Sequence, residues 1–136
     1  MSARSKARKT ALDLLYEADI RKSSALTLLS QRQEQVEYLI RDFTKELISG
    51  VEEHRRKIDE LIATYAQGWD MDRLPAVDRN ILRLAIYEIV WSTDLADGIA
   101  IDEALTLAKE LSTDESAGYI HGVLGKISSI KESIPI

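Results

Sequence analysis

LPAVDRNILRLAIYEI, residues 74–89, is the most strongly helical segment of this chain. Pro75 suits the first turn of a helix, because the backbone N–H that proline lacks has no intrahelical partner there. The apolar residues recur at spacings of three and four, which places them on one broad face of a helix. They are Val77, Ile81, Leu84, Ala85 and Ile89. The segment therefore predicts a long helix that packs into a core.

A polar stripe follows the same predicted helix. Arg79, Arg83 and Tyr87 stand four residues apart, and Glu88 points toward the apolar face. A carboxylate buried on that face needs a partner, because an isolated buried charge is costly. Two interpretations stay open. The arginines can present positive charge to a polyanion, or they can neutralise buried acids.

Helical periodicity also dominates the rest of the chain, and no segment carries a competing strand pattern. It covers residues 2–20, 24–29, 33–66, 99–111 and 112–130. Gly50 indicates a kink or a break inside the third of these, because glycine weakens a helix interior. The 136 residues include only two prolines and six glycines. We therefore expect one all-α domain, residues 1–136, with about seven helices.

Composition offers little support for catalysis. The chain has no cysteine, which excludes disulfides and thiolate metal sites. His54 lies in a fully charged stretch, and His121 has no second histidine one turn away. Gly118 and Gly122 indicate close helix–helix approach rather than a phosphate loop. We expect a non-enzymatic protein with no cofactor and no metal, and no apolar run is long enough for a membrane span. A cytoplasmic location follows as an expectation.

The chain opens with SARSKARKTALDLLYEADI, residues 2–20, although its formal net charge is −5. Four basic residues precede the first acid: Arg4, Lys6, Arg8 and Lys9. The apolar residues of this segment share one helix face, so the basic residues belong to an amphipathic helix and not to a free tail. Lys9 and Tyr16 are two turns apart and face the same way. Lysine can neutralise phosphate and tyrosine can stack on an unpaired base, which favours single-stranded RNA. The alternative is a tyrosine at the edge of the core.

Charge is unevenly distributed along the chain. From residue 84 to residue 136 there are three lysines and nine carboxylates, whereas basic and acidic residues nearly balance before that. A basic edge on an acidic body is typical of a protein with one polyanionic and one cationic partner. Chance asymmetry on a solvated surface is the alternative.

Four segments together resemble the NusB family of bacterial transcription antitermination factors. They are ARKTALDLLYEAD, LPAVDRNILRLAIYEI, AIDEALTLAKEL and TDESAGYIHGVLGKI. Their order and spacing agree with the family over essentially the whole chain. The resemblance implies a NusB-like fold of two small packed helical bundles, at about residues 1–70 and 71–136.

The resemblance also implies a function. Members of the family bind boxA RNA with the ribosomal protein NusE, within an RNA polymerase elongation complex that contains other Nus factors and transcribes ribosomal RNA operons. The RNA-binding residues it implies are Arg4, Lys6, Arg8, Lys9, Tyr16, Tyr65, Arg79 and Tyr119. The partner-binding residues it implies are Asp78, Asp114 and Glu115. A purely protein-binding helical adaptor without RNA contact is the alternative function, and the sequence leaves monomer or homodimer open.

The chain departs from the family pattern at several positions. His121 and Gly125 stand where asparagine and aspartate are usual, and Asp102 stands where asparagine is common. The opening helix also has two lysines among its four cations. Lysine cannot make the planar bidentate phosphate contact of arginine, so we expect weaker intrinsic RNA affinity and greater dependence on NusE.

Overall fold

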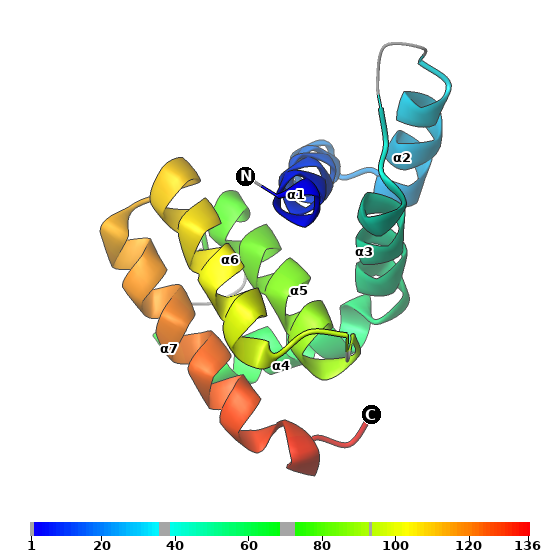
Figure 1. The fold of residues 1–136 in the computed structure, drawn as a ribbon. Coiled ribbons are helices and arrows are strands. Elements are labelled where there is room, and N and C mark those ends of the chain that lie inside the picture. The colour runs from blue at the N-terminus through cyan, green and yellow to red at the C-terminus, as the bar shows by residue number, and fades with distance from the viewer. Residues whose placement is uncertain (1, 36–38, 69–72, 93) are drawn as a thin grey trace.

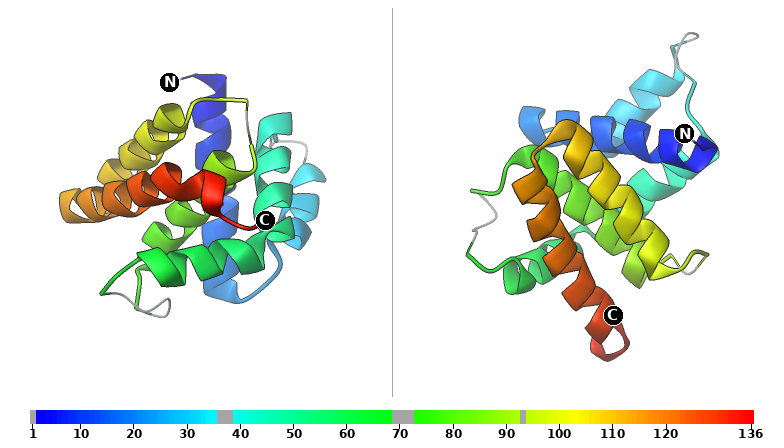
Figure 2. Two further views of the ribbon diagram at one scale, coloured as in Figure 1. Left: turned by 90° about the horizontal axis from the view of Figure 1, so that it is seen from below. Right: turned by 60° about the vertical axis from the view of Figure 1, so that its left-hand side comes forward.

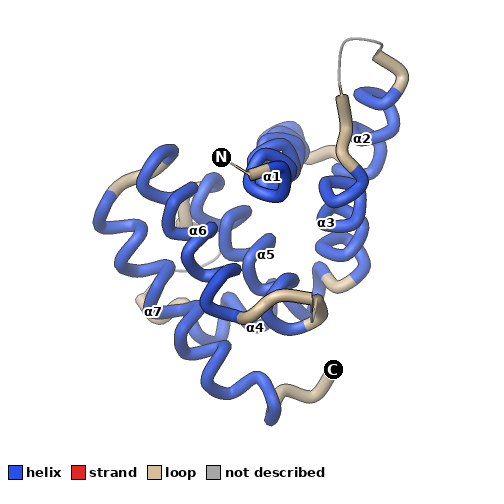
Figure 3. Tube along the Cα trace, in the orientation of Figure 1, coloured by secondary structure: helices blue, strands red, loops and turns tan. Residues whose placement is uncertain are grey.

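The computed structural model describes residues 2–35, 39–68, 73–92 and 94–136. These residues form seven α-helices and a short 3-10 turn, and they contain no strand (Figure 3). The all-α prediction with about seven helices is therefore confirmed. The elements are α1 (Ala3–Arg21), α2 (Ala25–Gln33), α3 (Asp42–Glu53), α4 (Arg55–Tyr65), α5 (Ala76–Val90), α6 (Asp97–Leu111), α7 (Asp114–Ile130) and η1 (Lys131–Ser133).

The helix predicted from residues 74–89 is α5, and it lies at the centre of the molecule. It packs against α1, α3, α4, α6 and α7 (Figures 1 and 2). Ten of its fifteen residues are buried, so α5 buries polar side chains as well as its apolar face. In Figure 1, α1 is seen nearly end-on, with α2 and α3 on one side and α6 and α7 on the other. A helix surrounded in this way must satisfy its buried polar groups internally.

Three helices begin at a hydroxyl side chain that accepts a hydrogen bond from a backbone N–H of the first turn. Ser2 caps α1, Ser24 caps α2 and Thr113 caps α7. Such a cap satisfies one of the backbone donors that have no partner at a helix start. The local sequence thus sets where α1 and α7 begin, and both helices carry residues predicted to bind partners.

The predicted kink at Gly50 is wrong. Gly50 lies inside α3, and the chain changes direction at His54, between α3 and α4. A Cβ built on Gly50 would lie 2.6 Å from Oη of Tyr87 and nearer still to that ring's Cζ and Cε1. Glycine therefore allows close packing of α3 on α5. His54 is half-buried, and its ring stacks on that of Trp91 with centroids 4.3 Å apart.

The division into two bundles stays a prediction. Its expected boundary, near residues 70 and 71, falls outside the described residues. Buried apolar side chains of α1 to α7 form one cluster around α5. No helix in the described ranges is both long and apolar enough to cross a membrane.

Candidate nucleic-acid interface

The predicted basic face of the opening helix exists on α1. Arg4 and Lys6 are exposed, Lys9 is half-buried, and Tyr16 is 42% exposed on the same side as Lys9. The ammonium of Lys9 donates to both carboxylate oxygens of Asp13, at 2.8 and 2.9 Å. That ion pair is exposed, so it is weak and a phosphate can compete with it. These side chains can meet a polyanion at the surface.

Arg8 differs from its neighbours, and its predicted surface contact with RNA is corrected by the structure. Its side chain is only 2% exposed. Its Nε donates to Oε2 of Glu88 at 2.9 Å and its Nη2 to Oε1 at 2.8 Å, while Nη1 lies 3.4 Å from Glu103. Burial alone would lower the pKa of Arg8, but the bonds and attraction of Glu88 and Glu103 raise it. Arg8 is thus the partner that Glu88 requires.

The two arginines of α5 make internal ion pairs. Nε of Arg83 donates to Asp59 at 2.8 Å, and its Nη1 donates to Asp19 at 3.2 Å, so the neutralising interpretation holds for this residue. Nε of Arg79 donates to Asp19 at 2.9 Å. Burial would raise the pKa of Asp19, but hydrogen bonds from Arg79 and Asn80, with the charge of Arg83, hold it below its usual value. Arg79 remains 16% exposed, so its predicted RNA role stays a prediction.

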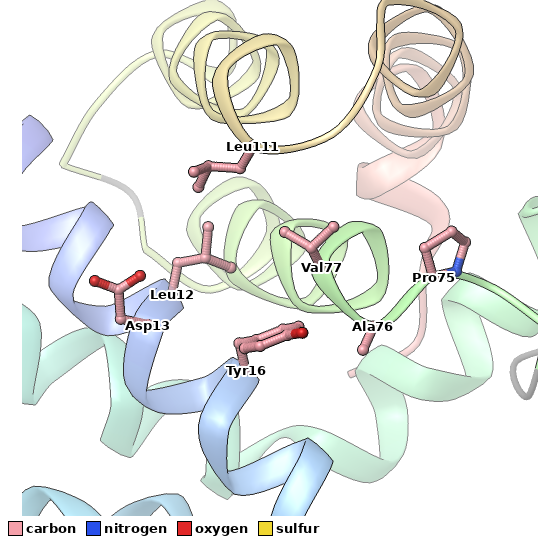
Figure 4. A pocket seen from close by; sticks show the side chains of 7 residues that line it. All are labelled: Leu12, Asp13, Tyr16, Pro75, Ala76, Val77 and Leu111. Atoms are coloured by element: carbon pink, nitrogen blue, oxygen red, sulfur yellow. The ribbon is translucent and has the colours of Figure 1, made fainter.

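An apolar hollow of about 370 Å³ adjoins Tyr16, between α1, the start of α5 and the end of α6. Figure 4 shows Leu12 and Tyr16 from α1, Val77 from α5 and Leu111 from α6 gathered around it. Leu111 is 41% exposed, which is high for a large apolar side chain. The hollow offers apolar contact directly beside the basic face of α1.

Two further hollows lie near this one, and each hollow shares one lining residue with the next. The second, of about 270 Å³, shares Pro75 with the first and is also lined by Asp78, Glu115 and Tyr119. The third, of about 610 Å³, shares Tyr119 with the second and is also lined by Tyr65. We call the three hollows together the α1–α7 groove. Tyr16 lines the first hollow, whereas Tyr65 and Tyr119 line the third together although they are far apart in the sequence.

The sequence analysis missed Lys126, which lines the third hollow near both tyrosines. It follows Tyr119 by seven residues, two helical turns, so its spacing alone could have placed it on the same face. Gly118 and Gly122 line this hollow too, and no described atom comes within 4 Å of a Cβ built on either. The predicted close helix approach at these glycines is therefore wrong, and they leave the groove open.

Burial raises the pKa of the Tyr119 phenol.

The predicted partner-binding acids fall into two groups. Asp114 and Glu115 are exposed in the first turn of α7, where the helix dipole favours carboxylates. Asp78 is only 3% exposed, which corrects its predicted role as a surface contact. Its Oδ2 accepts a hydrogen bond from Ser116 Oγ at 2.8 Å, so it joins α5 to α7. Only Asp114 and Glu115 can meet a partner as free surface charges.

Comparison with known proteins identifies the family. The model of the NusB family matches residues 5–129. The chain belongs to the NusB family. The transcription antitermination protein NusB of Thermobifida fusca is 47% identical over 134 residues, which cover 98% of this chain and 94% of that protein. This agrees with the resemblance of the four segments, so that prediction is confirmed.

Solved structures of the NusB family share the fold. T. maritima NusB superimposes with a TM-score of 0.83 at 28% identity, covering 98% of this chain and 99% of that one. A chain from the complex of antitermination factors NusB and NusE with double-stranded RNA gives a TM-score of 0.81 at 27% identity, covering 93% and 96%. The NusB-like fold predicted from the sequence is therefore confirmed.

The positions that depart from the family pattern lie at different depths. His121 and Asp102 are exposed, and Gly125 is half-buried. Within the described ranges, no group of three or more histidine or carboxylate side chains is arranged to hold a metal ion.

Proposed function

We propose that this protein is a transcription antitermination factor that binds boxA RNA together with NusE. One observation carries the proposal: Lys6, Lys9 and Tyr16 share the accessible side of α1, next to the α1–α7 groove, in a member of the NusB family. A relative of the same fold has been solved with NusE and double-stranded RNA. The protein acts by binding and not by catalysis, in the cytoplasm where RNA polymerase works.

The RNA side of the proposal rests on basic and aromatic side chains that lie beside the groove. Lys6 and Lys9 neutralise phosphates, and Tyr16 stacks on an unpaired base. Tyr65 and Tyr119 offer two more rings at the other end of the groove, with Lys126 beside them. Because the α1 cations near the groove are lysines, the intrinsic affinity is modest and a partner must contribute to RNA binding.

The partner side rests on the exposed acids of α7. Glu115 lines the second hollow of the groove together with Tyr119, and Asp114 precedes it in the first turn of α7. Neither acid forms an ion pair among the described residues. A basic ribosomal protein such as NusE complements this charge, which speeds association and orients the complex. RNA then bridges both proteins, and the pair joins RNA polymerase and the other Nus factors on ribosomal RNA operons.

The test is a titration of boxA RNA into the protein, with and without NusE, at several salt concentrations. The variant K6E/K9E reverses the charge of both lysines in the N-terminal half of α1. We expect it to weaken RNA binding by at least about tenfold and to flatten the salt dependence, because each lost phosphate contact removes about one unit of log–log slope.

The matched control is R21E/K22E, which makes the same charge change at the other end of α1, about 18 Å away by helical rise. We expect it to retain most RNA affinity. Wild-type protein that binds NusE but forms no RNA complex would instead favour the purely protein-binding adaptor. Equal losses in the two variants would show that only net charge matters, which contradicts the assignment of the α1 face.

A further inference from the structure

We propose that the buried pair of Arg8 and Glu88 is a positioning device, which sets the rotation of α1 so that Lys6 and Lys9 face the RNA. The inference rests on the proposed function and assigns Arg8 a role distinct from that of its basic neighbours. Arg8 does not touch RNA in this account. It holds the helix that does.

Four helices meet at Arg8. Its guanidinium forms the bidentate bond to Glu88 of α5, lies 3.4 Å from Glu103 of α6 and stands 5.2 Å from the ring centroid of Phe43 of α3. Glu88 is 6% exposed, so both charges of the main pair are removed from water. A buried bidentate pair tolerates little change in geometry, because any misalignment leaves a desolvated charge unsatisfied.

Neighbouring positions of α1 are held at the same place. Ser5 Oγ donates to Glu103 at 2.6 Å, and Thr44 Oγ1 of α3 donates to the carbonyl of Ala7 at 2.9 Å. These contacts and the Arg8 pair hold the N-terminal half of α1 against three other helices. Successive residues of a helix are about 100° apart, so fixing Arg8 inward directs Lys6 and Lys9 away from the core.

The N-terminal half of α1 needs such support. Its first turn contains no acidic residue, and its cations lie at the helix end where the macrodipole favours anions. The same cations that suit RNA therefore oppose helix formation. The buried pair offsets this effect, because Arg8 of the basic segment forms a stabilising tertiary contact with Glu88.

The test compares three variants. E88Q removes the charge that holds Arg8. R8M/E88L replaces the ion pair with apolar side chains of similar size, which often preserves packing. L28A removes a buried side chain of α2, away from the groove, and controls for a general loss of stability. Each is titrated with boxA RNA and NusE at several salt concentrations, and backbone hydrogen exchange is measured for residues 5–9 of the free protein.

We expect E88Q to weaken RNA binding by about tenfold and to reduce the log–log salt slope by about one to two units, as loss of two lysine contacts requires. Its amides in residues 5–9 exchange faster than those of the wild type. R8M/E88L restores affinity to within about twofold and slows exchange again, and L28A leaves both unchanged.

Three results overturn the proposal. The first is that E88Q binds RNA as tightly as the wild type does. The second is that R8M/E88L stays weak although its hydrogen exchange is restored, and the third is that L28A loses as much affinity as E88Q. Weak binding by a well-ordered R8M/E88L would mean that Arg8 itself contacts RNA. If the wild type binds no boxA RNA, the proposed function fails, and the exchange data alone decide whether the pair holds α1.

Discussion

Replacing Gly50 by alanine separates the effect of helix propensity from that of tertiary packing. Gly50 lies in the interior of α3, where alanine is favoured over glycine by about 1 kcal/mol. Propensity alone therefore predicts that G50A is more stable than the wild type. Packing predicts the opposite, because the added methyl group would overlap the ring of Tyr87 on α5.

The size of the packing effect follows from the contact. The new Cβ would lie 2.6 Å from Oη and closer to Cζ and Cε1, whereas carbon atoms pack at about 3.5–4.0 Å. The rigid ring must move by about 1 Å or more, or α3 must shift from α5. Overpacking of this kind costs about 1–3 kcal/mol, and we expect the upper half of that range. After the propensity gain, G50A should lose about 1–2 kcal/mol of unfolding free energy.

Urea unfolding followed by far-UV circular dichroism measures this loss, and the double-mutant cycle with Y87L locates its cause. Leucine lacks the ring atoms that meet the new methyl group, so G50A in the Y87L background should be stabilising by up to about 1 kcal/mol. The expected coupling between the two positions is about 2–3 kcal/mol. If G50A alone raises the unfolding free energy of the otherwise wild-type protein, the close contact between α3 and α5 is refuted.

Three further predictions concern pH, RNA affinity and capping. The folded pKa of Asp19 lies below its unfolded value. The ionised Asp19 therefore stabilises the fold fully above the unfolded pKa, near 3.9, and this stabilisation is lost as pH falls through the folded pKa. D19N should reduce the dependence of the unfolding free energy on pH in this acidic range. D13N removes the carboxylate that pairs with Lys9 and should raise RNA affinity about two- to threefold at low salt, measured by titration. T113A removes the cap that accepts from Ser116 N–H and should cost about 1 kcal/mol in thermal unfolding, whereas T113S should retain most of it.

The burial of Arg8 changes how the basic start of the chain works. Arg4 lies over the Phe43 ring at 4.6 Å from its centroid, and Arg8 is inside the molecule. Lys6 and Lys9 therefore carry the accessible positive charge nearest the groove. A count of basic residues in this segment therefore overstates the charge available to RNA, which fits the proposed dependence on NusE.

Periodicity predicted the helices well because each helix here has an apolar face that must be buried, and burial repeats with the helical turn. The central helix, the amphipathic α1 and the face shared by Lys9 and Tyr16 all follow from spacing. Family resemblance added Tyr65 and Tyr119, which the structure then brings to one groove. Spacing within one helix could not show that these two rings meet, because they come from α4 and α7.

The sequence by itself determined the helical class, the family and the basic face of α1, since these depend on residue types and local spacing. Only the tertiary structure decided which charges are internal. Arg8 and Lys9 are adjacent cations on one helix, yet Arg8 is buried against Glu88 and Lys9 is at the surface. Ion pairing between α1 and α5 spans 80 positions of the chain, and a pairing of that kind is fixed by how the helices pack, which local sequence does not encode.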